Sequence, residues 1–203
     1  MSRAWAAAAI MLAAAWSCPA QDVAEVTAAG QHQMLSDPGS PILGSAHADI
    51  TVVEYLDYNC SYCRKLAPAF GMLVGRDPHV AVLYKDWPIF GGVSVYAAKA
   101  ALAAQWQGKY LAAHDALIAA PRLAENAQVD AALAKAGIDM ARLKKDLDVR
   151  AGAINELLAR NQLEAGALNL PGTPGLVVGR YVVSNIGDLQ GLESAVAHAR
   201  SAH

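Results

Sequence analysis

The sequence predicts an α/β fold in which a helical block interrupts a single sheet, and three observations lead to this prediction. Ile50–Leu56 and Val80–Tyr84 are short, β-branched apolar runs separated by residues with helical spacing, which is the pattern of a βαβ unit with parallel strands. From Val93 to Leu168 the chain is rich in alanine, a strong helix former, and we expect four or five helices there. After Pro171 the pattern returns to strands and a final helix, so the sheet must close across the helical block.

Length and composition exclude several other classes of protein. The chain has 203 residues, of which 55% are hydrophobic and 17% charged, whereas disordered chains combine low hydrophobicity with high charge. Its formal net charge of −2 does not indicate a surface for binding nucleic acid, and we expect no such partner. A chain of this length can bury a sizeable core in one domain or in two lobes.

The N-terminal residues have the pattern of an export signal. The apolar run Ala4–Trp16 follows the basic Arg3 and is too short to span a bilayer. Small residues close the segment, which predicts a signal peptide over residues 1–20 with cleavage after Ala20. Two alternatives stay open, namely an N-terminal anchor that is never removed and a lipoprotein with its lipid on Cys18. Cleavage would leave a soluble protein in an oxidising compartment, where disulfides persist.

The remaining elements can be assigned in order along the chain. Residues 21–35 are a polar segment that fits one loose helix, and residues 36–41 form a turn cluster. Asn59 is the expected N-cap of the helix that follows the first strand, and Pro68 predicts a kink within that helix. Three later boundaries are marked by residues typical of helix caps and of a two-residue hairpin turn: Asp139, Gly179-Arg180 and Asp188.

Two of the three cysteines form a Cys-x-x-Cys motif. Cys60 and Cys63 lie between a predicted strand and a predicted helix, a context typical of a redox motif. The first sulfur lies beside the unpaired N–H groups of the first helical turn, which favour the nucleophilic thiolate. Lowering a cysteine pKa from about 8.5 to below 7 takes about 2 kcal/mol, and a helix N-terminus supplies up to about this amount. We predict Cys60 as the nucleophile, Cys63 as the resolving thiol, and a reversible disulfide between them.

Two other roles for this cysteine pair stay open. A zinc site needs four ligands, and although His79 and His114 are available, nothing in their spacing favours them. A purely structural disulfide would close a loop too short to constrain the unfolded chain much. We expect neither a metal nor a cofactor, and we interpret the scattered histidines as surface or packing residues.

Glu54 is a candidate proton donor and acceptor for the resolving thiol. Strand alternation places it on the same face as Val52 and Leu56, where burial would raise the pKa of its carboxyl group. Such an acid can exchange protons with a buried thiol during resolution. The other interpretation is a strand-end glutamate paired with Lys85.

Four further residues are candidates for binding a substrate chain. A cis bond before Pro174 would hold the backbone of Thr173 against an extended substrate, although Pro171 and Pro174 also fit ordinary trans loop positions. Tyr62 and Trp87 could line the substrate groove, and Trp87 fits a core position equally well.

Four ordered segments resemble the DsbA-like thiol-disulfide oxidoreductases of the thioredoxin superfamily, from about Ser36 to the C-terminus. The segments are Asp37–Gly44, Val53–Arg64, Tyr84–Gly91 and Leu170–Pro174. The resemblance implies a thioredoxin fold with an inserted all-helical domain, with Glu54 as the buried acid and Pro174 as a cis-proline facing the dithiol. The corresponding domain division has an N-terminal segment of residues 21–40, a thioredoxin-like domain of residues 41–92 and 170–203, and an inserted helical domain of residues 93–169.

The resemblance also implies a periplasmic enzyme that donates its Cys60–Cys63 disulfide to unfolded or reduced exported proteins. A membrane redox partner, DsbB-like or DsbD-like, would then reset the pair. Ser61-Tyr62 stands where the strongly oxidising archetype has Pro-His, so Cys60 lacks one stabilising neighbour. The segment before Ser36 is too short for a stable coiled coil, which predicts a monomer. The alternatives are a disulfide reductase or isomerase using the same dithiol, and a redox-inactive chaperone or metal-handling protein using an apolar groove around Trp87.

Overall fold

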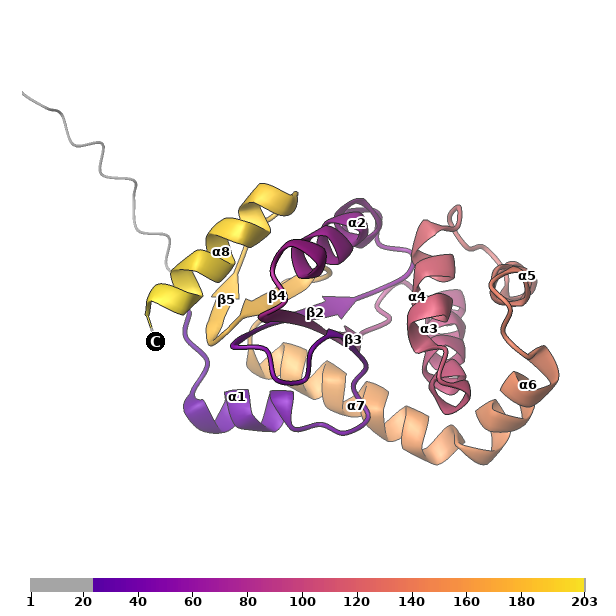
Figure 1. Cartoon of the computed structure of the whole chain (residues 1–203). Helices are drawn as coiled ribbons and strands as arrows, with labels where there is room; N and C mark the ends of the chain where they lie inside the picture. Colours follow the sequence, from indigo (N-terminus) through magenta and orange to yellow (C-terminus); the bar gives the residue numbers. More distant parts are fainter. Residues whose placement is uncertain (1–23, 203) are drawn as a thin grey trace, which may run out of the picture.

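One five-stranded sheet organises the chain in the computed structural model, which describes residues 24–202 (Figure 1). The strands lie in the order β1-β3-β2-β4-β5. β2 and β3 are parallel, and the other neighbouring pairs are antiparallel. The predicted signal peptide and Cys18 lie outside the described residues. The strands are β1 (Ile42–Gly44), β2 (Ile50–Leu56), β3 (Val80–Asp86), β4 (Gly175–Val178) and β5 (Tyr181–Val183).

Helices cover both faces of this sheet and form a separate block at one side. Figure 1 shows α2 and α8 on one face, α1 and α7 on the other, and α3 to α6 beside the sheet. No helix within residues 24–202 has both the length and the apolar character needed to cross a bilayer. The limits predicted for the two domains stay a prediction. The helices are α1 (Ala28–Leu35), α2 (Ser61–Arg76), α3 (Gly92–Ala104), α4 (Tyr110–Ala119), α5 (Asn126–Lys135), α6 (Met140–Val149), α7 (Ala151–Ala167) and α8 (Leu189–Ser201), with a 3-10 turn at Gln105–Gln107.

The central strand β2 is buried on both faces, and its alternation decides where Glu54 lies. Val53 and Tyr55 belong to the apolar cluster on the α1 and α7 face. Val52 and Leu56 belong to the larger cluster, which includes side chains of α2 and α8. Because successive side chains of a strand point to opposite faces, Glu54 lies on the α2 side, as the sequence predicts.

Lys85 is fully buried in β3, on the face opposite Glu54. It lies directly across from Tyr55 in the β2–β3 register. Its Nζ forms ion pairs with Glu164 of α7 at 3.0 Å and with Asp37 at 3.6 Å. The Tyr55 hydroxyl also donates a hydrogen bond to Glu164, at 3.1 Å. The alternative that pairs Glu54 with Lys85 is therefore wrong, because the sheet itself separates the two side chains.

Three predicted boundaries are confirmed. The side chains of Asp139 and Asp188 cap α6 and α8, each accepting a hydrogen bond from a backbone N–H of the first turn, at 3.0 and 2.9 Å. Gly179-Arg180 forms the turn between β4 and β5, and Gly179 has a φ of 60°, a left-handed backbone that favours glycine.

Two local features of the structure differ from what the sequence predicts. The sequence does not predict β1, because it has only three residues and ends at Gly44, whose φ is 95°. The N-cap of α2 is Cys60 and not Asn59: Cys60 has the extended backbone of a cap, and its sulfur accepts the N–H of Cys63. The helix continues through Pro68 to Arg76.

Candidate redox site

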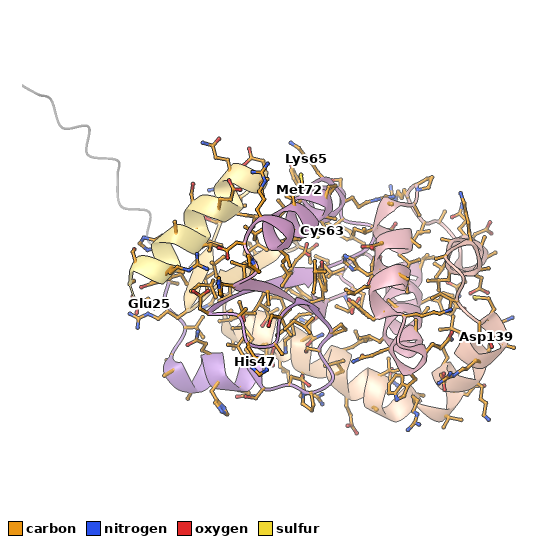
Figure 2. The ribbon with its side chains drawn as sticks, viewed as in Figure 1. Glu25, His47, Cys63, Lys65, Met72 and Asp139 are labelled. Atoms are coloured by element: carbon orange, nitrogen blue, oxygen red, sulfur yellow. The ribbon has the colours of Figure 1, made fainter. Side chains whose placement is uncertain are left out.

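The two cysteines lie at the start of α2, where the chain leaves the central strand. Cys60 caps the helix, and the N–H of Cys63 points to its sulfur at 3.5 Å. Figure 2 shows Lys65 and Met72 on the outer side of α2, whereas Cys63 is fully buried on the inner side. Both thiols are free, so the structure represents the reduced pair, and the disulfide between them stays a prediction for the oxidised form.

The two thiols have opposite acidities. The pKa of Cys60 is lowered to about 5, chiefly because the Cys63 thiol donates a hydrogen bond to it; burial opposes this, and the backbone N–H groups of Cys63 and Tyr62 reinforce it. Burial raises the pKa of Cys63 far above its ordinary value, and its hydrogen bond to Cys60 and the charge of Glu54 raise it further. At neutral pH the pair is therefore a Cys60 thiolate beside a Cys63 thiol.

Glu54 is buried within the same region, as the sequence predicts. It is 1% exposed, and neither carboxyl oxygen has a hydrogen-bond partner among the described residues. Burial raises its pKa well above the ordinary value, and the charges of Cys60 and Asp86 raise it further. A carboxyl group with its pKa raised in this way keeps its proton to a higher pH than an ordinary glutamate, which suits a proton donor to a Cys63 thiolate.

Asp86 is a second buried acid, which the sequence analysis does not identify. It ends β3, is 1% exposed, and accepts a hydrogen bond from the Tyr110 hydroxyl at 2.9 Å. Its pKa is raised to about 7, mainly by burial. The Tyr58 hydroxyl lies 3.4 Å from that of Tyr110 and 3.3 Å from Nδ1 of His114, which is buried among these rings. His114 is therefore a packing residue, as the sequence analysis expects.

The peptide bond between Thr173 and Pro174 is cis, as one interpretation of the sequence expects. The carbonyl oxygen of Thr173 lies 3.0 Å from the Cys60 sulfur, which can donate a hydrogen bond to it only when protonated. Beside this contact lies a cleft of about 560 Å³, whose lining includes Tyr62 and Phe90. Tyr62 is 72% exposed and also lines a second hollow together with Thr173 and Pro174. The role of Tyr62, Thr173 and Pro174 in binding a substrate chain stays a prediction.

The prediction that Trp87 lines the substrate groove is wrong. Its indole is 7% exposed and packs edge-on against Tyr55, in the cluster on the α1 and α7 face of the sheet. Nε1 donates a hydrogen bond to Oε1 of Gln162 on α7 at 2.7 Å. Trp87 is therefore a core residue on the face opposite the dithiol, because strand alternation continues one residue past Asp86.

Asp57 organises the loops around the dithiol, a role that the sequence analysis missed. Its carboxylate is 1% exposed and accepts hydrogen bonds from the N–H groups of Asn59, Ile89 and Phe90 at 2.7, 2.7 and 2.9 Å. It also accepts one from the hydroxyl of Ser94 on α3, at 2.7 Å. One side chain thus joins the dithiol loop, the loop that lines the cleft, and the first helix of the insertion. An acidic residue within an apolar segment beside the motif was the available signal.

Comparisons with known proteins agree with this fold. A family model described as thioredoxin matches residues 36–197. Among curated proteins, the sodium/proton antiporter NhaA 1 of Salinispora arenicola is 29% identical over 161 residues, which cover 78% of this chain and 24% of the antiporter. The chain thus spans about a quarter of the length of that relative.

Solved structures resemble this fold over most of the chain. A thioredoxin-like oxidoreductase from Silicibacter pomeroyi is 38% identical, with a TM-score of 0.79, over 85% of this chain and 98% of that one. The catalytic domain of Proteus mirabilis ScsC is 27% identical, with a TM-score of 0.77, over 85% and 96%. The thiol-disulfide exchange protein alpha-DsbA2 of Wolbachia pipientis is 26% identical, with a TM-score of 0.76, over 83% and 91%. The chain therefore belongs to the thioredoxin family, and its fold, with a helical insertion, resembles those of DsbA-like and ScsC members of that family.

Proposed function

We propose that this protein is an oxidase that transfers its Cys60–Cys63 disulfide to reduced, exported proteins. The observation that carries the proposal is the position of the Cys60 sulfur at the start of α2, where it receives hydrogen bonds from the thiol and the N–H of Cys63. These contacts stabilise the thiolate, and therefore the reduced form of the protein. A protein whose reduced form is stabilised gives up its disulfide readily.

The reaction we propose has two exchange steps. A substrate thiolate attacks the Cys60 sulfur, the Cys60–Cys63 bond breaks, and Cys63 leaves as a thiolate that takes a proton from Glu54. A second substrate thiolate attacks the substrate sulfur of the mixed disulfide, and Cys60 leaves as a stable thiolate. The substrate loses two electrons and gains a disulfide, while the protein pair gains the two electrons. In this scheme Thr173, Pro174 and Tyr62 line the path of the substrate chain.

The proposal extends to compartment and partners. The predicted signal peptide supports export, and one structural neighbour is described as a periplasmic thioredoxin-like protein, from Salmonella enterica. We propose that the protein acts in the periplasm as a monomer and that a DsbB-like or DsbD-like membrane partner resets the dithiol. A DsbB-like partner would withdraw electrons from it, whereas a DsbD-like partner would supply them to a reductase or isomerase.

The redox potential of the pair tests the direction of electron flow. After equilibration with glutathione buffers, the fraction of oxidised Cys60–Cys63 gives the potential, and we expect roughly −200 mV or a higher value. The control is the same protein with both cysteines alkylated beforehand. It cannot form the disulfide, so it gives the background of the signal that reports the oxidised fraction. A potential near −270 mV, that of thioredoxin, would contradict the oxidase and favour a reductase.

A further inference from the structure

Two arginines line the same cleft of about 560 Å³ as Cys60. Arg64 comes from α2, and Arg122 comes from the connection between α4 and α5. No aspartate or glutamate of the described chain lines this cleft. Within residues 24–202 neither arginine forms an ion pair, so both charges are available to a bound chain.

Arg64 is positioned by a contact with the end of α4, and Arg122 by contacts of the connection that follows α4. Nε of Arg64 donates a hydrogen bond to the carbonyl oxygen of Ile118, near the end of α4, at 3.3 Å. Asn59, the residue before the first cysteine, donates to the carbonyl oxygen of Leu123 at 3.0 Å and accepts its N–H at 2.9 Å. Because Leu123 follows Arg122 directly, this pair of bonds fixes the backbone of Arg122 relative to the dithiol loop.

A second, larger hollow continues from Arg122 along the helical insertion. It has a volume of about 690 Å³, lies between α4 and α5, and is walled mainly by alanine side chains. Lys135 of α5 adds a second cation to its lining, and again no acidic residue from the described part of the chain is present there. Arg122 lines both hollows, so the three cations Arg64, Arg122 and Lys135, here called the basic track, line two neighbouring hollows of which one includes Cys60.

We propose that the basic track binds the substrate segment next to the reactive cysteine and prefers segments that combine acidic with small apolar side chains. This inference rests on the proposed function and adds the substrate class to it. Carboxylates complement the three cations, and small apolar side chains complement the alanine walls. Charge complementarity of this kind acts mainly on the association rate, and like charges in a basic segment would repel.

Two matched peptides test this preference. Each is a reduced dithiol peptide with the same cysteine pair, flanked either by alternating Glu and Ala or by alternating Lys and Ala, and its reaction with the oxidised protein is followed by stopped flow. We expect a rate constant about tenfold larger for the acidic peptide at low salt. The ratio should fall towards one at about 1 M salt. Equal rates at low salt would overturn the inference, whereas no reaction with either peptide would overturn the proposed function itself.

Variants at Arg122 and Lys135 test whether the basic track causes the preference for the acidic peptide. Arg122→Gln should lower the acidic-to-basic ratio, and the double variant Arg122→Glu with Lys135→Glu should bring it below one, because a single positive charge remains against two negative ones. Lys144→Gln, on α6 outside both hollows, is the matched control and should keep the wild-type ratio. All three positions are exposed, and thermal unfolding checks that the variants fold. A double variant with the wild-type ratio would contradict the proposal.

Discussion

Replacing Cys60 with alanine should abolish thiol-disulfide exchange, whereas replacing Cys63 should stop the reaction halfway. In Cys63→Ala the Cys60 sulfur loses the hydrogen bond from the Cys63 thiol but keeps the backbone N–H groups at the start of α2. It still attacks a disulfide-bonded peptide as the thiolate and forms a mixed disulfide that no second thiol of the site can resolve. In Cys60→Ala the remaining thiol is fully buried and its pKa is raised by that burial, so it should not react. This asymmetry follows from the different positions of the two sulfurs on α2.

Intact-protein mass spectrometry measures this difference directly. Each variant is incubated with an excess of oxidised peptide at neutral pH, and the mass of one peptide added through a disulfide is quantified over time. The adduct should accumulate on Cys63→Ala and stay absent from Cys60→Ala. Adducts that form on Cys60→Ala at a similar rate would show that the two roles are assigned wrongly. Near-ultraviolet circular dichroism of both variants controls for loss of tertiary structure.

Glu54→Gln should slow the exchange about 100-fold or more at neutral pH while leaving the fold intact, a size typical of lost general acid–base catalysis. Glutamine has the shape of glutamate but can neither give a proton to the Cys63 thiolate nor take one from the thiol. The measurement is the rate at which the oxidised protein is reduced by a dithiol peptide, as a function of pH. A variant with the wild-type rate and pH profile would exclude Glu54 from the proton transfer.

Glu54 should also lower the stability of the protein at neutral pH. Burial, then the charges of Cys60 and Asp86, raises its pKa above the ordinary value of 4.5. Between that value and the raised one, the folded protein keeps a proton that the unfolded chain has lost, so this contribution to stability falls as the pH rises. Glu54→Leu should raise the free energy of unfolding by about 1–3 kcal/mol, more at pH 8 than at pH 5. Urea unfolding of the variant and the wild-type protein at pH 5 and pH 8 measures this difference. A variant whose stability at pH 8 equals or falls below that of the wild-type protein would contradict the prediction.

Much of the fold follows from local patterns that are strong in this chain. The apolar runs of β2 and β3, and the acidic caps Asp139 and Asp188, depend on residues close together in sequence, and each lies where the pattern predicts it. The sequence does not predict β1, because this three-residue edge strand is stabilised by its pairing with β3. Such long-range pairing produces no recognisable pattern in so short a segment.

The sequence predicted residues of the site only where they belong to a local motif or pattern. Spacing identified the cysteine pair, and alternation placed Glu54 on the correct face. Asn59 illustrates the limit: its amide bonds to Leu123, far away in the sequence, and this contact takes it away from the capping role that its residue type suggests. Asp57 and Asp86 were missed for the same reason, because the groups that bind them come from α3, α4 and the loop after β3.

The ionisation of the Cys60 thiol tests the central claim most directly. Thiolate absorbance near 240 nm, measured from acid to alkaline pH on the reduced protein and on Cys60→Ala as the blank, reports this group alone. The account predicts a transition with a midpoint near pH 5, because the pKa of Cys60 is lowered to about 5 by its contacts at the start of α2. A midpoint near pH 8.5, the value of an ordinary cysteine, would show that these contacts do not activate the thiol.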